Sequence, residues 1–206
     1  MGRITFTTDL AAAIARGEET QTRRLVTRGS SRTSIGLDRL DLDAAWVDRG
    51  FPHEPDGAYL RQYLKAPVLA GDDIEGTSHR VCPRHEPGDV LDVCESFVVL
   101  DALGRRVSGP VAERQPRWSV LVRRRGSHIA GVHWRSGRFM PSWAVQQRIR
   151  VTAVRPERLL DISEADARAE GFENRAGFIA AWDRINKGRE PGDSPWVWVI
   201  NFEREV

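Results

Sequence analysis

The stretch "IRVTAVRPERLLDISEADARAEGF", residues 149–172, decides the fold class because its periodicity changes part-way along. Residues 149–159 alternate apolar and polar side chains, which is typical of a strand with one buried face. Ser163 then stands three positions before Asp166, a spacing that resembles a capping box and predicts the start of a helix. The chain thus passes from strand to helix within a few residues, which favours a fold that mixes the two kinds of element.

The same criteria predict further helices and strands towards both termini. Asp9 is expected to cap a helix that stops at Gly17, and Pro141 suits the first position of a single helical turn or loop. Two strand-like runs that meet near Gly126 predict a hairpin. The expected strands cover 4–8, 20–28, 87–100, 117–125, 127–136, 149–159 and 194–205. The expected helices cover 10–16, 38–50, a short piece of 58–64, 163–172 and 174–188.

These elements predict a mixed α+β domain built on a mostly antiparallel sheet or a small barrel. With 206 residues, the chain is long enough to bury a sizeable core, and we expect a single domain over 1–206. Prolines, glycines and histidines between about 51 and 87 indicate an insertion. Trp182, Trp196 and Trp198 follow helical or strand periodicity, so we expect all three in the core.

Composition excludes several classes of protein. No apolar run approaches the roughly 20 residues that span a bilayer, and the N-terminus lacks a signal-peptide core, so we expect a cytoplasmic protein without a membrane partner. Only two cysteines, Cys82 and Cys94, are present, which argues against a disulfide framework and a four-ligand zinc site. Cys82 lies near His79 and His85 but lacks paired-ligand spacing, so we interpret the three as part of a polar loop. No metal, no cofactor and no oligomeric state is predicted.

The charges are unevenly distributed along the chain. The net charge is only +2, yet the segment from Arg114 to Arg155 holds ten arginines and no acidic residue. A general preference for arginine explains the identity of these cations, since Lys65 and Lys187 are the only lysines. That preference does not explain the missing acids. A contiguous basic segment on a nearly neutral chain predicts a polyanionic partner.

A second unusual stretch, "GEETQTRR", residues 17–24, places two acids, two threonines and two arginines next to an apolar helix. Two explanations are open at this point. The stretch is either a solvated connection between two elements or the floor of a functional site.

Several motifs resemble one known family. "GEETQTRR", after a short strand and helix, is similar to the Gly-x-Lys-x-x-Glu-x-Arg signature of ASCH domains, and in particular to the Gly-Arg-Lys-Thr-Gln-Thr-Arg-Arg form of the phage and prophage branch. "CPRHEPGDVLDVCESF", residues 82–97, and residues 139–172 resemble further stretches of that branch. "FIAAWDRINKG" and "PWVWVINFE" resemble its closing helix and strand. The motifs keep the family's order and leave about 25–80 unaccounted for, so we expect the insertion there.

The resemblance implies a PUA-like small β-barrel with flanking helices and a cleft lined by the signature. It also implies binding of RNA or nucleosides. One branch of the family removes the acetyl group of N4-acetylcytidine with a lysine, a threonine and a glutamate. These three positions fall on Glu19, Thr22 and Glu170, and the last arginine of the signature falls on Arg24.

The chemistry of amide hydrolysis fits these residues only in part. Thr22 offers a hydroxyl and Glu170 a base, and the two are expected to face one another across a shared hollow. The family's lysine position holds Glu19, whose charge has the wrong sign to stabilise an oxyanion. An acid beside a second acid instead raises its neighbour's pKa and gives an acid/base pair. Whether the chain is an enzyme is therefore open, and we favour binding over hydrolysis.

The binding interpretation uses arginines that contact phosphates and aromatic residues that stack on bases. Trp134 and Phe139 interleave with arginines, and Trp143 is equally compatible with a cleft and with the core. The candidate binding residues are Gly17, Gln21, Arg23, Arg24, Trp134, Arg138, Trp143 and Arg148.

Three functional hypotheses follow from these residues. The first is a binder of RNA, single-stranded DNA or a modified nucleoside. The second is a hydrolase of a modified nucleobase, or a ribonuclease. The third is a phage interaction module that contacts a protein through its arginine-rich segment, in the cytoplasm of the host.

Overall fold

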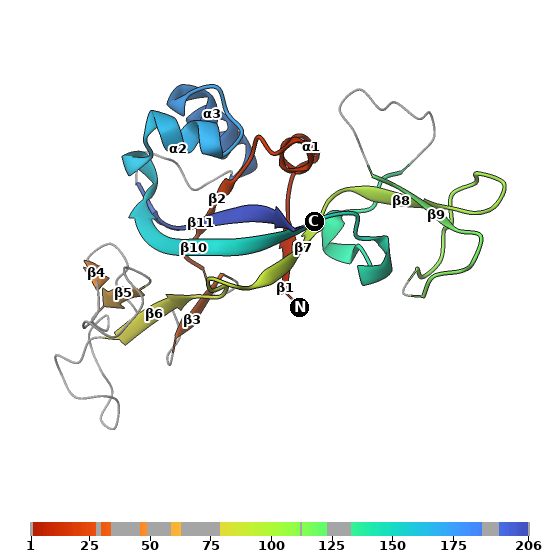
Figure 1. Cartoon of the computed structure of the whole chain (residues 1–206), viewed down its shortest axis with the longest axis horizontal. Coiled ribbons are helices and arrows are strands. Elements are labelled where there is room, and N and C mark those ends of the chain that lie inside the picture. The colour runs from red at the N-terminus through yellow and green to blue at the C-terminus, as the bar shows by residue number, and fades with distance from the viewer. Residues whose placement is uncertain are drawn as a thin grey trace. The chain divides into compact units, whose positions relative to one another are not determined.

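The computed structural model describes residues 2–27, 30–33, 46–48, 59–62, 79–111, 113–122, 133–186 and 194–205 (Figure 1). The chain divides into two compact units, each assembled from segments that are far apart in the sequence. Unit 1 comprises Met1–Thr20, Asp89–Arg150 and Glu203–Val206, and unit 2 comprises Gln21–Gly88 and Val151–Phe202. Strands β10 (Arg148–Arg158) and β11 (Trp196–Glu205) contribute residues to both units.

The strands of unit 1 are arranged around β7 (Val90–Cys94), most of whose residues are buried. Strand β1 (Gly2–Thr5) pairs with β7 in parallel. The first residues of β10 pair with the other edge of β7 in antiparallel, with Arg148 opposite Asp92. Opposite charges thus stand directly across two neighbouring strands, an arrangement that stabilises the pair.

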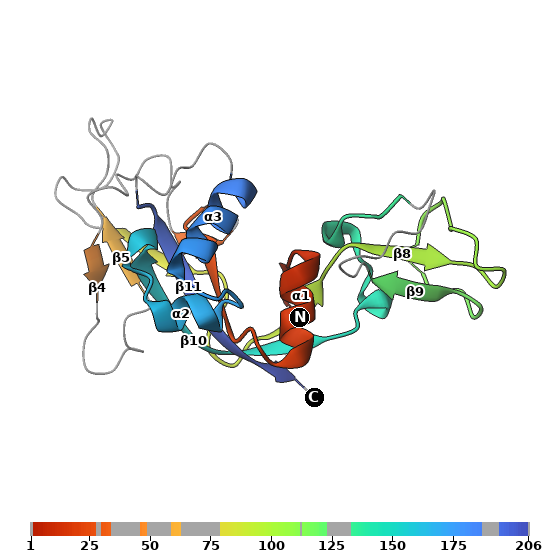
Figure 2. The ribbon, with the colours of Figure 1, turned by 90° about the horizontal axis from the view of Figure 1, so that it is seen from above.

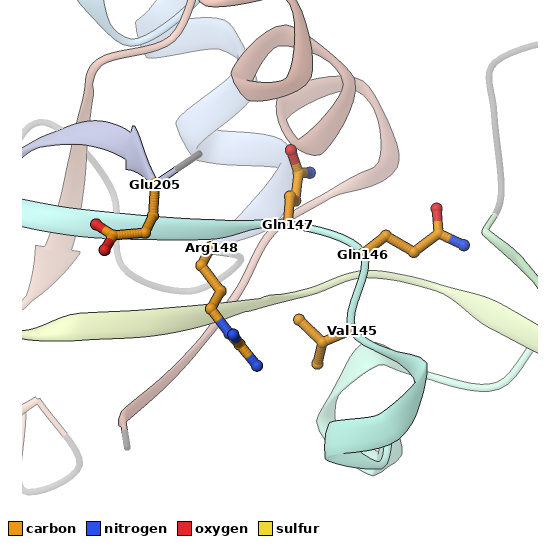
Figure 3. A pocket seen from close by; sticks show the side chains of 5 residues that line it. All are labelled: Val145, Gln146, Gln147, Arg148 and Glu205. Carbon is orange, nitrogen blue, oxygen red and sulfur yellow. The ribbon is translucent and has the colours of Figure 1, made fainter. Parts of the chain in front are cut away.

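Helix α1 (Thr8–Arg16) follows β1 in unit 1. Thr7 caps its first turn through the side-chain oxygen, and Gly17 ends it with φ 75°, in the left-handed region that favours glycine. The side chain of Gln147 donates to the main-chain oxygen of Ala11 at 2.9 Å and so ties α1 to the start of β10 (Figure 3).

A second part of unit 1 combines a β-hairpin-like pair with two short 3₁₀ turns. Strand β8 (Phe97–Leu100) pairs with β9 (Ser119–Val122) in antiparallel. The turns η3 (Gly137–Phe139) and η4 (Ser142–Ala144) precede β10. These elements share a buried cluster, called the unit 1 cluster, formed by Cys94, Phe97, Val99, Val111, Met140 and Ala144.

Gly137 shows why η3 has a fixed place on this cluster. A Cβ atom at this position would lie 2.8 Å from the main-chain nitrogen of Glu95, closer than real Cβ atoms approach backbone. The turn therefore touches the backbone after β7 directly, which only a glycine permits.

Unit 2 contains the β2–β11 strand pair and a separate sheet of four strands. Strand β2 (Gln21–Leu25) pairs with β11 in antiparallel, with Arg23 opposite Val199. Four more strands form an antiparallel sheet in the order β3-β6-β5-β4. Their bounds are Ser31–Thr33 for β3, Trp46–Asp48 for β4, Tyr59–Gln62 for β5 and His79–Pro83 for β6.

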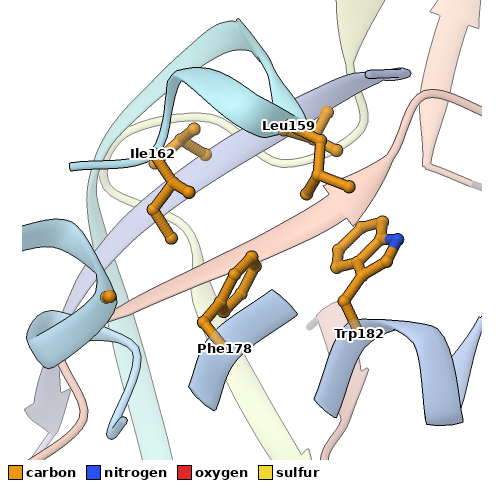
Figure 4. Packing of buried hydrophobic residues seen from close by; sticks show 7 residues of the cluster. Leu159, Ile162, Phe178 and Trp182 are labelled. Carbon is orange, nitrogen blue, oxygen red and sulfur yellow. The ribbon is translucent and has the colours of Figure 1, made fainter. Parts of the chain in front are cut away.

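Helices α2 (Glu164–Ala169) and α3 (Arg175–Ile185) lie together beside β10 and β11 (Figure 1, Figure 2). Ser163 caps α2, and a 3₁₀ turn, η5 (Leu159–Asp161), leads into it from β10. Figure 4 shows how Phe178 and Trp182 of α3 face the residues after β10. The buried residues of this cluster are Leu159, Ile162, Ala167, Phe178, Trp182, Val197 and Val199.

These observations confirm a mixed α+β protein with mostly antiparallel pairing. The longest strand order is β1-β7-β10-β11-β2, and the β1–β7 pair is its parallel exception among the registers given above. Within the described residues this sheet has two edges, β1 and β2, and does not close into a barrel. None of the described helices is long and apolar enough to cross a bilayer.

Several expected elements are confirmed, and others are wrong. The strands in 20–28, 149–159 and 194–205 and the capped helices in 163–172 and 174–188 are present. Trp182 and Trp198 are buried in the core, as expected, while Trp196 is half-buried.

The helices expected in 38–50 and 58–64 are wrong where they are described, because Trp46–Asp48 and Tyr59–Gln62 are strands. Pairing with neighbouring strands, β4 with β5 and β5 with β6, overrides the helical spacing of these short segments, since strand preference depends on neighbours. The first helix is capped by Thr7 rather than Asp9. The hairpin near Gly126 and most of the insertion at 25–80 lie outside the described residues.

Candidate functional site

The stretch "GEETQTRR" changes from exposed to buried within a few residues. Gly17 and Glu18 are exposed, and Glu18 forms an ion pair with Arg16 at 2.6 Å. Glu19, in unit 1, is only 2% exposed, whereas Thr20 is exposed again. The last four residues of the stretch, 21–24, belong to unit 2, where Gln21, Thr22 and Arg23 are all buried. The stretch is therefore neither a simple solvated connection nor an open floor.

Arg23 is the centre of a buried ionic cluster in unit 2. Its guanidinium donates to Glu170 at 2.8 Å and to Glu157 at 2.7 Å, and it lies 3.6 Å from an oxygen of Asp166. The side chain of Arg23 is 0% exposed. Its planar fork also lies 5.8 Å from the ring centre of Phe178. A cation this deep is compatible with folding only because carboxylates surround it.

Two further residues complete this cluster. Gln21 accepts a hydrogen bond from Arg23 at 2.6 Å and donates to Asp166 at 3.0 Å and to Asn201 at 2.7 Å. Arg155 pairs with Glu157 at 3.1 Å and with Asp166 at 3.3 Å. We call this set the Arg23 cluster: Gln21, Arg23, Arg155, Glu157, Asp166 and Glu170. It joins β2, β10 and the α2 region.

Glu170, at the C-terminal cap of α2, carries the carboxyl group whose pKa is shifted most strongly in the cluster. Burial raises the pKa of its carboxyl to about 7, although the charges of Arg23 and Arg24 and hydrogen bonds from Arg23 act in the opposite direction. Three carboxylates share one guanidinium, so the most deeply buried of them is the one that takes up a proton. For Arg23, burial acts to lower the pKa, but Glu170 and Glu157 outweigh it and hold the pKa above its ordinary value.

Asp166 behaves in the opposite way because it is nearer the surface. Burial acts to raise its pKa, but hydrogen bonds from Ser163 and Gln21 and the charges of Arg23 and Arg155 lower it below the ordinary value. The cluster thus holds one acid that exchanges its proton near neutral pH and one that stays ionised, a combination used in acid/base chemistry.

The expected catalytic pair is placed as follows. Thr22 and Glu170 are both 4% exposed and both belong to unit 2. Successive side chains of a strand point to opposite faces, so Thr22 points away from the face on which Arg23 meets Glu170. No hydrogen bond joins Thr22 to Glu170 in the part of the chain that the structure describes. Of the signature residues, Gln21 and Arg23 contact the glutamate or its neighbours directly, and Arg24 acts on it through its charge.

The remaining predicted residues lie in unit 1. Trp143 is half-buried: its indole nitrogen donates to the main-chain oxygen of Val111 at 2.9 Å, and its ring lies 6.3 Å from that of Trp118. Trp143 is thus neither fully in the core nor fully in a cleft, because it packs against the unit 1 cluster and is still partly accessible. Trp134 is also half-buried, and Arg138 is exposed.

In the folded protein, acids from other parts of the chain neutralise several arginines of the arginine-rich segment. Arg148, Arg150 and Arg155 form ion pairs with acids from other parts of the chain. Arg135 donates to the main-chain oxygens of Val107 and Gly109 at 2.8 Å. The exposed arginines without a polar partner among the described residues are Arg114, Arg117 and Arg138. Residues 123–125 lie outside the description.

A pocket of about 220 Å³ lies in unit 1 at the start of β10, lined by Val145, Gln146, Gln147, Arg148 and Glu205 (Figure 3). Elsewhere, no group of three or more His, Cys, Asp or Glu residues in the described ranges could hold a metal ion. Cys82 and His85 are both half-buried, at β6 and just after it.

Glu157 and Arg155 were not predicted from the sequence as members of a site. Both positions follow the two-residue period of β10, so their shared face was a usable signal. Asp166 was recognised only as the partner of a helix cap, a role that it does have, with Ser163 at 2.8 Å.

Comparison of the chain with protein-family models, with curated proteins and with solved structures finds no match.

Proposed function

We propose that this protein binds single-stranded nucleic acid, with RNA as the first candidate, through unit 1. The observation that carries the proposal is the pair Arg138 and Phe139 on η3. Phe139 is 69% exposed, although a large aromatic side chain normally hides in the core, and Arg138 beside it is exposed too. An accessible ring takes a stacked base, and a neighbouring guanidinium takes a phosphate. We call these two residues the η3 surface.

The contacts that hold η3 in place support this role. Met140, directly after Phe139, is fully buried in the unit 1 cluster, and Arg3 donates to its main-chain oxygen. Gly137 holds the other end of the turn against the backbone near Glu95. A ring held on a rigid turn loses little conformational freedom when a base stacks on it, which favours binding.

Two more exposed arginines extend the cationic area. Arg114 and Arg117 lie in a segment whose ends, Val111 and Trp118, both contact Trp143 of η4. They provide further phosphate contacts that carry no sequence information. The resemblance to ASCH domains supports the same substrate class, and a PUA-like barrel and a cytoplasmic location belong to the same proposal.

The proposal is tested with a fluorescent oligouridylate of about ten nucleotides, titrated at about 50 and 200 mM salt, since affinity for a polyanion falls with salt. Phe139→Ala is expected to weaken binding by on the order of 1–3 kcal/mol, the contribution of one stacked base. Leu103→Ala is the matched control, because Leu103 is another exposed apolar residue of unit 1, at 73% exposure. Absence of binding at the lower salt, or equal affinity of the two variants, contradicts the proposal.

A second candidate is hydrolysis of a modified nucleobase in unit 2, and the raised pKa of Glu170 favours it. An acid that exchanges its proton near pH 7 is suited to general acid/base catalysis. Its test is turnover of N4-acetylcytidine by the wild type, by Glu170→Gln and, as the control on the opposite face of β2, by Thr22→Ala. Activity that Glu170→Gln abolishes and Thr22→Ala retains, in proteins that remain folded, supports hydrolysis with Glu170 as the acid or base. If the wild type shows no turnover, the Arg23 cluster has a structural role alone.

A further inference from the structure

The face of unit 1 at the start of β10 carries two ion pairs side by side. Arg148 donates through Nε to Asp92 at 3.0 Å, and Arg150 donates to Glu205 at 2.5 Å. Positions 148 and 150 of a strand point to the same face, so the carboxylate of Glu205 shares a face with the guanidinium of Arg148. Neither of these ion pairs belongs to the η3 surface.

The pocket at this face has a size that limits its ligand. Its volume is about 220 Å³. Pockets for drug-sized ligands occupy roughly 300–1,000 Å³, so this one suits a single nucleobase or a group of similar size. Figure 3 shows Val145 and Arg148 extending to one side of the strand, while Gln147 turns to the other side. Val145 gives the pocket an apolar wall beside its charged groups.

Hydrogen-bonding groups of both kinds remain available there. Arg148 uses only its Nε in the contact with Asp92 and is 47% exposed, so its two terminal amino groups are free among the described residues. Glu205 uses one oxygen for Arg150, and no described donor meets the other. Asp92 is buried and fixes the direction of the Arg148 fork. The pocket thus presents an oriented double donor and an acceptor on one face.

This combination distinguishes between the bases. Guanine carries two adjacent acceptors, O6 and N7, which an arginine fork contacts in the commonest specific arrangement. It also carries two adjacent N–H donors, on N1 and N2, which suit a carboxylate. Uracil places its N–H between two carbonyl oxygens, which repel a carboxylate. Adenine has no carbonyl oxygen for the fork, and cytosine has one amino group only.

We infer that the pocket formed by Val145, Gln146, Arg148 and Glu205 takes one unpaired guanine of the bound strand. Arg148 donates to the O6 and N7 side, and Glu205 accepts from N1–H and N2–H. This inference rests on the proposed binding of single-stranded nucleic acid by the η3 surface. It adds a base preference that stacking on Phe139 does not provide, because every base has a face that stacks.

The test compares oligouridylates of about ten nucleotides that carry one central guanine, adenine, cytosine or uracil. The wild type is expected to bind the guanine oligonucleotide at least about fivefold more tightly than the others, the lower end for one bidentate contact. Glu205→Gln is expected to remove this preference, because the affinity for the guanine oligonucleotide falls to that for the other three. Glu203→Gln is the matched control, since Glu203 is exposed on the same strand and outside the pocket.

The outcomes separate the two proposals. Equal affinity of the wild type for all four oligonucleotides overturns the guanine pocket while the η3 surface stands. A guanine preference that survives in Glu205→Gln, or is lost equally in Glu203→Gln, also overturns it. If no oligonucleotide binds at about 50 mM salt, the proposed function fails, and the guanine pocket fails with it.

Discussion

Arg23 in unit 2 and Arg138 in unit 1 have opposite surroundings. Arg23 is enclosed by three carboxylates and Phe178, with no exposed side-chain surface. Arg138 is exposed on a short turn beside an exposed phenylalanine. Arg23, from the "GEETQTRR" stretch, therefore stabilises the interior of unit 2, whereas Arg138, from a short turn, faces the solvent.

A charged residue in the sequence is therefore not necessarily a charge at the protein surface. A buried guanidinium has already exchanged its water for carboxylates, so it has little left to offer a phosphate. An exposed guanidinium on a rigid turn keeps its donors free. Substitutions in the two units should therefore have different effects on stability and on binding.

The largest effect is expected for Arg23→Ala. Removing the cation leaves Glu157, Asp166 and Glu170 close together without their shared partner, and breaking a buried pair in this way costs roughly 3–5 kcal/mol of unfolding free energy. Urea denaturation measures the loss. Arg138→Ala, the control in unit 1, is expected to change stability by less than about 0.5 kcal/mol. Similar losses for the two variants would remove the contrast.

Gly137→Ala tests the mounting of the η3 surface. The added methyl group would meet the main chain at Glu95 and Cys94 at 2.8–2.9 Å, so we expect a loss of about 1–3 kcal/mol from overpacking. Oligonucleotide affinity should fall as well, because Phe139 would be displaced. Gly109→Ala is the control, since a Cβ there meets nothing within 4 Å. A Gly137→Ala protein as stable as Gly109→Ala would show that the close approach is not needed.

The pH dependence of stability tests the Arg23 cluster. The pKa of Glu170 is raised from 4.5 to about 7, so the folded state holds a proton that the unfolded state releases. This contribution is fully present below pH 4.5 and is lost as the pH rises through about 7. The wild type should therefore lose stability relative to Glu170→Gln by up to about 1.4 kcal/mol per pH unit across that window. Parallel stability curves for the two proteins would contradict the assignment.

The smallest effect is expected for Arg117→Ala. It should leave folding unchanged and reduce the slope of log affinity against log salt by about one, the signature of one lost phosphate contact. Arg184→Ala removes the same charge from an exposed position on α3 in unit 2 and should leave the slope unchanged. Equal slopes for both variants would indicate that general charge, rather than the surface of unit 1, attracts the oligonucleotide.

Much of the fold was accessible from the sequence wherever the signal was local. The strand and capped helix of 149–172 follow from periodicity and from the Ser163–Asp166 spacing, and both are present. Strands β4 and β5 were missed because their stability depends on strand pairing, β4 with β5 and β5 with β6, rather than on their own residues.

The candidate site was harder to predict because its contacts are remote in sequence. Arg23 meets Glu157 across 134 positions and Glu170 across 147, and no local pattern encodes such distances. Glu170 was predicted as a site residue through the family resemblance, whereas Glu157 and Arg155 were not predicted. The sequence named Phe139 as a candidate for base stacking because it lies among arginines, but an aromatic residue beside a methionine suits a core equally well, so its 69% exposure follows only from the structure.

The most direct test of the contrast is amide chemical-shift mapping during titration with an oligouridylate. The account predicts that the largest shifts fall on residues 113–118 and 137–144 of unit 1, while 21–25 and 157–170 of unit 2 remain unchanged. Shifts concentrated on Arg23, Glu170 and their neighbours, with none at Arg138 and Phe139, would contradict it.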